Sequence, residues 1–371
     1  MNINSDQAIR FAQNEINNLN CNEDDFPFDG WKKLAEFGVF ALPISEEHSG
    51  LGVSCEETCD VLEALGYAMD DQGLLHAACT QILCGIAIDK FGSDEIKAEY
   101  LPKICDGSLI MAQALTEPNA GSALGEMATT ALLDDSGNYH VKGSKIFTSN
   151  GPIATSVLVF CVTHPQRKSF GRISCLIMDP PLQGMNQSKA MKKMGLHSLK
   201  NGELFFDDCI VPESKILGKP GAGDAISNSV MSWERTILFA TMVGKQQKIL
   251  EGCIQYANER HQGGQAIAKY QAVSHKIADM KVNHHLSKLV VKDAANAIDS
   301  GKNAMLESAI CKLVVSEKLK AAALDSVQIR GGYGYMTEYP AEGDVRDSMA
   351  STIYSGTSEI QKNIIARLIG L

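Results

Sequence analysis

The sequence predicts an α+β protein in three parts, because its hydrophobic periodicity changes twice along 371 residues. Apolar residues recur at three- and four-residue spacing up to about Cys105, which is the pattern of helices. Short β-rich runs replace that pattern between Met111 and Ile226, and long helical periodicity then returns. We therefore expect an N-terminal helical domain over residues 1–111, an antiparallel β-domain over 112–226 and a C-terminal helical bundle over 227–371.

Apolar faces and chain breakers mark the helices expected in the first part. Residues 31–37 and 59–65 each place apolar side chains on one helical face. The run Gly-Leu-Gly at 50–52 interrupts this pattern. The run Phe-Gly-Ser-Asp at 91–94 predicts the end of one helix, followed by an N-cap at Ser93.

The later elements are predicted from the same periodicities. Residues 156–162 and 202–206 are rich in β-branched and aromatic residues, as strands are, and Gly, Pro, Asn and Asp separate such runs. Beyond Ile226, helical periodicity continues through Glu251 and then covers residues 271–298 and 303–328, with few breakers. Helices of that length usually pack as a bundle.

Composition and charge exclude several classes of protein. Hydrophobic residues make up 44% and charged residues 21% of the chain, which is the balance of a globular protein. The formal net charge of -10 argues against nucleic acid or an anionic membrane as the main partner, since both attract basic surfaces.

The start of the chain and its cysteines indicate the compartment. Residues 1–7 lack the pattern of a secretory signal and no apolar run is expected to span a bilayer, so we expect a cytoplasmic protein. The 11 cysteines form no Cys-x-x-Cys pair, and Cys55 and Cys59 have no matching His or Cys cluster. Reduced thiols are therefore expected, with neither a disulfide framework nor a metal site.

The glycine-rich run Gly-Gly-Tyr-Gly at 331–334 is no dinucleotide fingerprint. It sits between helical stretches, without the preceding strand and the following acidic residue that a Rossmann turn requires. A nicotinamide-binding Rossmann domain is therefore not expected.

Several segments resemble the signature segments of the flavin-dependent acyl-CoA dehydrogenase superfamily. They are residues 116–122 (TEPNAGS), 143–151 (GSKIFTSNG), 193–212, 328–347 and 354–361 (YSGTSEIQ). Because they occur in the family's order at matching intervals, the chain is identified as a member. The resemblance implies a C-terminal four-helix bundle and bound FAD. It also implies removal of a proton alpha to a thioester carbonyl, coupled to hydride transfer from the beta carbon to the flavin.

The resemblance assigns a set of residues to the cofactor. They are Gln113, Leu115, Thr116, Ser122, Phe147, Ser149, Arg260, Gln271, Gln328, Gly331, Gly332, Thr357 and Glu359. Leu115, Thr116, Phe147 and Ser149 offer hydrogen bonds to the flavin edge and an apolar wall, as a flavin ring requires. Without a cofactor, Thr116 and Ser149 are equally explained as strand ends and Phe147 as a core residue.

The part of the cofactor beyond the flavin ring is assigned by resemblance alone. Ser122 and Arg260 match pyrophosphate contacts. Gln271, Gln328 and the two glycines match adenosine contacts, many of them across a subunit interface, so dimerisation would complete the site. Arg260 is equally explained as a cation at a helix C-terminus. Gly263 departs from the family pattern, because it replaces a Phe that usually packs on the adenosine side.

Two positions compete for the role of the base. Ser355 stands where many members carry the catalytic carboxylate, and a hydroxyl is a poor base at neutral pH. Glu234 occupies the alternative base position, and its apolar neighbours are expected to desolvate it and raise the pKa of its carboxyl. A solvated carboxylate or an ion pair with Arg235 is the alternative interpretation. By resemblance, Arg235, Tyr354 and Ser355 bind the substrate.

The finer resemblance suggests a substrate. Residues 232–235 (SWER), 271–276 and 353–358 most resemble dehydrogenases that oxidise a prolyl group held on a peptidyl or acyl carrier protein. The leading hypothesis is oxidation of such a prolyl or similar aminoacyl thioester in specialised metabolism, with oxygen or an electron-transfer flavoprotein as acceptor. A short- or branched-chain acyl-CoA dehydrogenase that uses Glu234 is the second hypothesis, and a flavin-free scaffold without activity is the third. A homo-oligomer, dimer or tetramer, is also implied.

Overall fold

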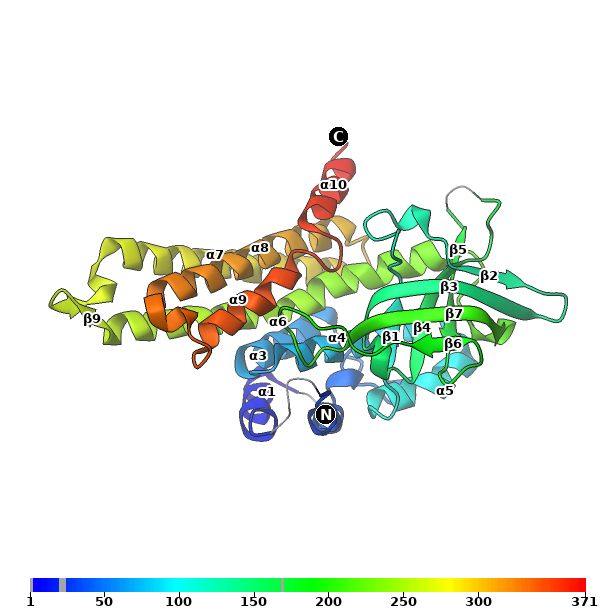
Figure 1. The fold of residues 1–371 in the computed structure, drawn as a ribbon, viewed down its shortest axis with the longest axis horizontal. Coiled ribbons are helices and arrows are strands. Elements are labelled where there is room, and N and C mark those ends of the chain that lie inside the picture. Colours follow the sequence, from blue (N-terminus) through cyan, green and yellow to red (C-terminus); the bar gives the residue numbers. More distant parts are fainter. Residues whose placement is uncertain (1–2, 20–24, 168–169) are drawn as a thin grey trace.

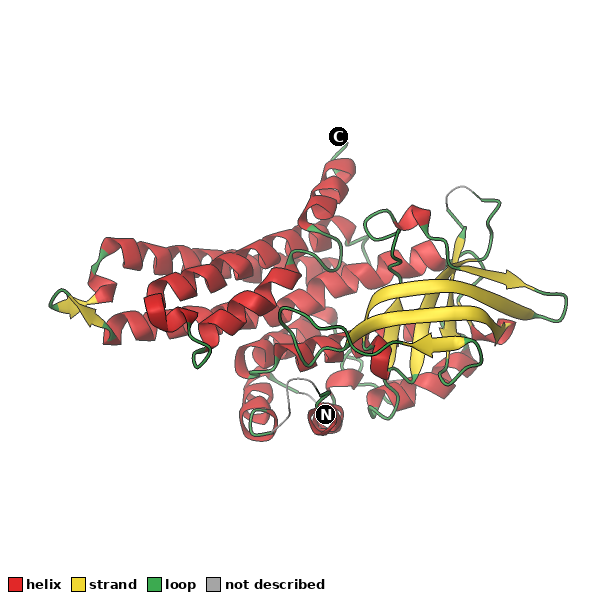
Figure 2. Cartoon of the chain, in the orientation of Figure 1, coloured by secondary structure: helices red, strands yellow, loops and turns green. Residues whose placement is uncertain are grey.

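The computed structural model describes residues 3–19, 25–167 and 170–371. Helices from the first third of the chain pack against a β-domain and a long helical bundle (Figures 1 and 2). The predicted α+β class and the order of helical domain, β-domain and helical bundle are confirmed. Residues 1–2 at the start of the chain and Cys21 belong to the sequence-based expectations but lie outside the described residues.

The first part of the chain is helical, as predicted, and its expected apolar faces lie within helices. The helices are α1 (Ser5–Phe11), α2 (Phe28–Phe37), α3 (Cys55–Ala68), α4 (Gln72–Phe91) and α5 (Asp94–Cys105). Helix α4 ends before Gly92 as predicted, and the hydroxyl of Ser93 caps α5 by accepting the backbone N–H of Ile96 at 3.3 Å.

Helix α4 is the central helix of this domain. Within the described residues it alone is long and apolar enough to cross a membrane, contrary to the expectation that no such run exists. However, 78% of its apolar window is buried inside the fold, as in a core helix of a globular protein. Its length and apolar composition therefore follow from being surrounded by other elements.

The β-domain contains one mixed sheet rather than a purely antiparallel one. Its strands are β1 (Met111–Ala114), β2 (Thr130–Leu133), β3 (Asn138–Ser149), β4 (Ser156–Val162), β5 (Ile173–Met178), β6 (Met185–Gln187), β7 (Asn201–Pro212) and β8 (Ile216–Leu217). The order is β6-β7-β3-β2-β4-β5-β8, and most neighbours are antiparallel. Strands β1 and β2, however, pair with β4 in parallel. The prediction of an antiparallel domain needs this correction, because apolar periodicity does not reveal strand direction.

The C-terminal helices form the long bundle on the left of Figure 1. They are α6 (Gly223–Glu259), α7 (Gln271–Asp299), α8 (Met305–Arg330), α9 (Pro340–Ser351) and α10 (Ser358–Leu368). A short hairpin of β9 (His261–Gln262) and β10 (Gln265–Ala266) joins α6 to α7 at the end of the bundle far from the sheet. Helix α10 projects away from the other helices (Figure 1).

Two glycines let α6 cross α3 at close range. A Cβ atom at Gly66 on α3 would lie 1.9 Å from the carbonyl oxygen of Thr241, and one at Gly244 on α6 would lie 1.9 Å from that of Glu63. Any side chain at either position would therefore push the helices apart. This contact fixes the middle of α6, just after the candidate base at position 234, against the N-terminal domain.

Candidate active site

A cavity of about 560 Å³ lies where α4, the strands β1 and β3, helix α6 and the chain after α9 meet. Its volume is within the roughly 300–1,000 Å³ of ligand-binding pockets. Glu234 lines it from α6, and Tyr354 and Ser355 line it from the segment between α9 and α10. The cavity therefore brings together the two candidate base positions, which are 121 residues apart in sequence.

Glu234 faces the cavity in a hydrogen-bonded and desolvated state. Its carboxylate accepts a hydrogen bond from the Ser355 hydroxyl, and the residue is half-buried because it opens on the cavity. Burial raises the pKa of the Glu234 carboxyl, while the Ser355 hydroxyl and the charge of Arg235 oppose the rise. A carboxyl with a raised pKa beside a cavity is suited to removing a proton.

Arg235 follows Glu234 on α6, but its guanidinium group binds the backbone of the opposite segment. Its Nε donates to the Ser355 carbonyl oxygen at 3.0 Å, and the side-chain amide of Gln361 donates to the same oxygen at 3.1 Å. Ser355 has a φ of 58°, which is uncommon for a residue other than glycine. Both donors therefore hold the turn that directs the Ser355 hydroxyl toward Glu234. Neither a solvated carboxylate nor an ion pair with Arg235 describes Glu234 in this structure.

Tyr354 forms a wall of the cavity next to Ser355. Its ring packs edge-on against the imidazole of His76, with centroids 4.8 Å apart, and lies 6.1 Å from the ring of Phe239. Its hydroxyl is 4.0 Å from the sulfur of Met242. These contacts hold the ring in one place, at the position where the sequence predicts a substrate contact.

Residues predicted to hold the flavin, and Ser122, which is predicted to contact the pyrophosphate, line the same cavity. They are Gln113, Leu115, Thr116, Ser122, Phe147 and Ser149. The Phe147 side chain is 63% exposed, and its φ of 57° falls at an irregularity in the pairing of β3 with β7. The side-chain amide of Asn201 donates to the Phe147 carbonyl at 3.1 Å and to the Ser149 hydroxyl at 3.2 Å. An exposed ring on a strained backbone, beside polar groups, fits a planar aromatic ligand such as a flavin.

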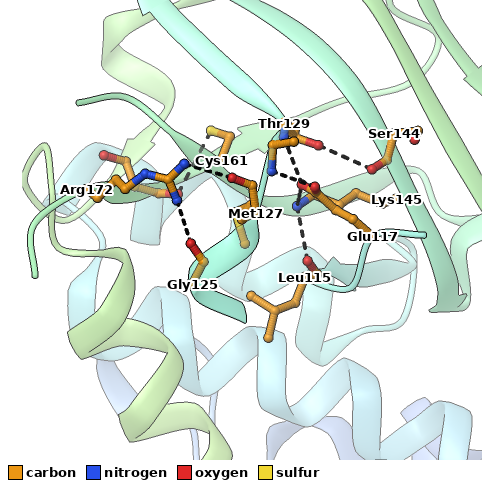
Figure 3. Close-up of polar contacts among 11 residues, drawn as sticks. Leu115, Glu117, Gly125, Met127, Thr129, Ser144, Lys145, Cys161 and Arg172 are labelled. Atoms are coloured by element: carbon orange, nitrogen blue, oxygen red, sulfur yellow. Dashed lines mark hydrogen bonds and ion pairs between the residues drawn. The ribbon is translucent and has the colours of Figure 1, made fainter. Parts of the chain in front are cut away.

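A buried ion pair lies close to Leu115 (Figure 3). The ammonium of Lys145, whose side chain is fully buried, donates to Glu117 at 2.8 Å and to the Leu115 carbonyl at 3.1 Å. The Glu117 carboxylate also accepts backbone N–H bonds from Ala128 and Thr129, at 2.7 and 2.9 Å. The pair therefore ties together the two segments that carry the flavin-side residues.

The remaining cofactor residues lie elsewhere in the chain. Arg260 and the glycines at 331 and 332 line a second cavity, of about 600 Å³, at the far end of the bundle. Gln271 and Gln328 are exposed near the same end. Glu234 and Arg260 are joined by a continuous stretch of α6. At a rise of 1.5 Å per residue, this stretch is about 39 Å long, so the two cavities lie far apart. One chain therefore does not present both groups of residues to a single ligand.

Of two further cofactor candidates, Thr357 lines the first cavity and Glu359 does not. Thr357 lines the first cavity and caps α10, since its hydroxyl accepts the backbone N–H of Ile360 at 3.3 Å. Glu359 is exposed in the first turn of α10 and is not among the residues that line the cavity.

The structure adds residues that sequence reasoning missed. His76 on α4 and Thr148 on β3 both line the cavity. The buried Thr148 hydroxyl has no hydrogen-bond partner in the described part of the chain. The amide of Asn150, just after β3, donates to the carbonyls of Ala77 at 3.2 Å and Met111 at 3.1 Å, so it fixes α4 against the sheet. His76 has no sequence signal, because it lies within an apolar core helix.

The cysteines and other possible metal ligands of the described residues do not gather into a metal-binding cluster. Among the residues that the structure describes, no group of three or more His, Cys, Asp or Glu side chains is arranged to hold a metal ion. All ten described cysteines are buried free thiols.

All three parts of the chain match family models. Residues 4–108 match the N-terminal domain of acyl-CoA dehydrogenase, residues 112–209 its middle domain and residues 221–370 its C-terminal domain. The chain belongs to the acyl-CoA dehydrogenase family and is an oxidoreductase of that type.

Several similar proteins within the family have names that refer to a prolyl carrier protein or to proline. An L-prolyl-[peptidyl-carrier protein] dehydrogenase of Pseudomonas fluorescens is 37% identical over 342 residues, which cover 92% of this chain and 90% of the relative. The crystal structure of the prolyl acyl carrier protein oxidase AnaB superposes with a TM-score of 0.96 at 34% identity, over 99% of this chain and 98% of AnaB. The structure of PigA with FAD and proline superposes with a TM-score of 0.95 at 34% identity, over 99% of this chain and 96% of PigA.

Proposed function

We propose that this chain is an FAD-dependent enzyme that oxidises a prolyl or similar aminoacyl group, held as a thioester on a peptidyl or acyl carrier protein. The observation that carries the proposal is Glu234, which faces the cavity and accepts a hydrogen bond from the serine at the other base position. The relatives whose names specify prolyl carrier proteins support this substrate.

The chain's own residues perform the proton chemistry. A thioester acidifies the proton on the adjacent alpha carbon, and Glu234 takes that proton once its carboxyl is ionised. The Ser355 hydroxyl stabilises the carboxylate and orients it, while Arg235 holds the Ser355 backbone. Bound FAD supplies the acceptor for the hydride that leaves the beta carbon. Leu115, Thr116 and the aromatic ring of Phe147 bind its ring system.

A second copy of the chain completes the cofactor site in this proposal. Arg260 and the glycines at 331 and 332 line a cavity about 39 Å from Glu234 along α6. In a symmetric dimer, each chain offers this far end of its bundle to the other. The adenosine of FAD would then be bound by the partner copy, and the pyrophosphate would lie between the partner's Arg260 and Ser122 of the first chain. Gly263 would leave the adenosine without its usual aromatic neighbour.

The rival hypotheses differ in substrate or cofactor. A short- or branched-chain acyl-CoA dehydrogenase would use Glu234 in the same way. Relatives named short-chain specific acyl-CoA dehydrogenase and isovaleryl-CoA dehydrogenase, 32% and 33% identical, support this rival. A flavin-free scaffold is disfavoured, because a candidate base and a wall of flavin-type residues face the same cavity.

The electron acceptor and the compartment form a further part of the proposal. One relative is named a dehydrogenase and another an oxidase, so oxygen and an electron-transfer flavoprotein are both acceptors to be tested. Reoxidation of the reduced flavin in air, without added protein, identifies oxygen. The free thiols of the described cysteines support a reducing compartment such as the cytoplasm.

The proposed function is tested by rapid mixing of the oxidised, FAD-loaded enzyme with a panel of thioesters under anaerobic conditions. The panel contains prolyl, butyryl and isovaleryl groups, each presented on a carrier protein and on CoA. We expect the prolyl carrier protein to bleach the flavin absorbance fastest. Bleaching only by the CoA esters of butyrate or isovalerate would overturn the proposal in favour of the acyl-CoA hypothesis, and purified protein that retains no flavin after reconstitution would favour the scaffold.

A further inference from the structure

His76 is a polar side chain on the part of the cavity wall that α4 forms, where Thr80 is also polar. It lines the cavity from α4, one turn before Cys79 and two turns before Leu83, which also line it. The imidazole is half-buried, and no hydrogen bond joins it to another described residue. Its edge-on contact with Tyr354 uses the ring but leaves the two ring nitrogens without a polar partner in the described chain. Such a polar group in a pocket needs a ligand or water to satisfy it.

His76 is uncharged at neutral pH. Burial lowers the pKa of the imidazole to about 4, and the nearby positive charge of Lys193 adds to this effect. A neutral imidazole has one N–H donor and one nitrogen lone pair. It therefore offers a hydrogen-bond acceptor to an amine without placing a positive charge in the cavity.

The position of His76 relative to the base is fixed by three contacts. Its ring packs on Tyr354, whose chain neighbour Ser355 donates to Glu234. The amide of Asn150 holds the carbonyl of Ala77, next to His76, against β1. The pKa of the Cys79 thiol on α4 is raised, mainly by burial. The charge of Glu234 adds to this rise, so Glu234 lies close to α4. His76 and Glu234 therefore border the same chamber.

A prolyl thioester differs from a simple acyl thioester at one relevant atom. Its ring nitrogen is bonded to the alpha carbon, which is the carbon that loses its proton to Glu234. Burying this amine without a hydrogen-bond partner would be unfavourable. A cavity that binds a prolyl group must therefore offer this nitrogen a polar partner.

We propose that His76 binds the ring nitrogen of the prolyl group, accepting its N–H as a hydrogen bond, and thereby selects aminoacyl over simple acyl thioesters. This inference rests on the proposed function and names the residue that determines its substrate class. His76 is a substrate-binding residue in this account, and Glu234 remains the base. No covalent step passes through the imidazole.

The test compares two ligands that differ only at the ring nitrogen. They are prolyl-pantetheine and cyclopentanecarbonyl-pantetheine, each with an amide in place of the thioester so that neither is oxidised. Calorimetry measures their dissociation constants for the FAD-loaded wild-type enzyme and for His76→Phe. We expect His76→Phe to weaken the prolyl ligand about 10- to 100-fold, the size of a lost hydrogen bond to a buried polar group. The cyclopentane ligand should bind the two proteins equally or prefer the variant.

Two further variants control for packing and folding. His76→Gln keeps a hydrogen-bond acceptor and should retain part of the preference for the prolyl ligand. His285→Gln changes an exposed histidine on α7 and should leave both constants unchanged. Melting temperature and flavin content are measured for every variant, and His76→Gln decides the question if His76→Phe does not fold.

The possible failures are distinguishable. Two results overturn the role of His76 while the proposed function stands. In one, both variants weaken the binding of the two ligands equally. In the other, neither variant weakens the binding of either ligand. A wild-type enzyme that binds neither ligand and whose flavin is not reduced by the prolyl thioester overturns both.

Discussion

At the scale of single residues, the candidate base is set by two opposing influences. Burial beside the cavity raises the pKa of Glu234, and the hydrogen bond from Ser355 lowers it by stabilising the ionised form. Ser355 thus has a clear chemical role although its hydroxyl is no base. Many family members carry the catalytic carboxylate at position 355. Here the Ser355 hydroxyl instead donates to the carboxylate of Glu234.

Ser355→Ala should move the pH dependence of flavin reduction to higher pH. The change removes the hydrogen bond that favours the ionised carboxylate, so the pKa of Glu234 rises further. Because the ionised form takes the proton, the rising limb of the rate moves in the same direction. Anaerobic single-turnover rates across pH measure this shift, with the exposed Ser300→Ala as the control. An unchanged or lowered limb would contradict the contact.

Glu234→Gln should raise the melting temperature at neutral pH. The pKa of Glu234 is raised in the folded protein, so the folded state binds the proton more tightly than the unfolded state. Stability then falls as pH rises from the unfolded pKa through the folded pKa, and the penalty is fully present above both. The amide has no such penalty, so the gain should disappear at acidic pH. Calorimetric scans across pH test this, with Glu338→Gln on the surface as the control.

The residue scale also shows what sequence reasoning could not reach. Resemblance assigns Glu234 to the base position, because the spacing of residues along α6 does not reveal which element faces this side chain. Arg235 lines the cavity, so its predicted substrate contact stays a prediction, and its guanidinium also holds the Ser355 backbone, a contact that the sequence does not predict. His76 carries no pattern at all. Only the packing of α4 against Tyr354 brings it into the cavity.

At the scale of elements, the flavin-side wall depends on how two segments of the β-domain are joined. The ion pair of Glu117 with Lys145 connects them, and both side chains are almost completely buried. The carboxylate is satisfied by two backbone N–H groups as well, which is the geometry that a buried pair requires.

Lys145→Met should destabilise the protein and weaken flavin binding. It leaves the Glu117 carboxylate buried without its cation, and breaking a buried pair in this way costs about 3–5 kcal/mol. Urea unfolding and flavin retention on a desalting column measure the two effects. Lys142→Met is the matched control on the same strand, because its side chain is 62% exposed and such pairs contribute about 0–1 kcal/mol. Equal stability of the two variants would contradict the structural role of the pair.

Helices were easier to predict than strand directions in this chain. The ends of α4 and α5 follow from Gly92 and Ser93, which are local signals. The parallel pairing of β1 with β4 depends on a crossover through β2 and β3, and no local pattern encodes it. The cavity itself lies between elements from all three domains, so its lining was predicted by family resemblance and not by periodicity.

At the scale of the whole molecule, the predicted cofactor residues fall at two ends of the bundle. The separation of about 39 Å along α6 follows from the number of helical residues between Glu234 and Arg260. The sequence gives the number of residues between Glu234 and Arg260. Their distance in space follows only once the structure shows that these residues form one continuous helix. Symmetric pairing of two chains is the arrangement that would bring the two ends together.

Mixing two inactive variants should restore activity. In a dimer of Glu234→Gln with Arg260→Glu, one of the two sites combines an intact Glu234 from one chain with an intact Arg260 from the other. Random subunit exchange should therefore recover about a quarter of the wild-type sites. Each variant alone is the control, and flavin reduction by prolyl carrier protein is the measurement. No recovery after verified subunit exchange would indicate that Arg260 does not contribute to the partner's site.

The central claim is that Glu234 removes the alpha proton of a carrier-bound prolyl thioester. Its most direct test is anaerobic single-turnover reduction of the flavin by L-prolyl carrier protein, with wild-type enzyme and with Glu234→Gln at equal flavin content. We expect rapid bleaching by the wild type and a loss of about 10²- to 10⁴-fold in the variant, the usual contribution of a general base. A variant that reduces its flavin within a few-fold of the wild-type rate would contradict the claim.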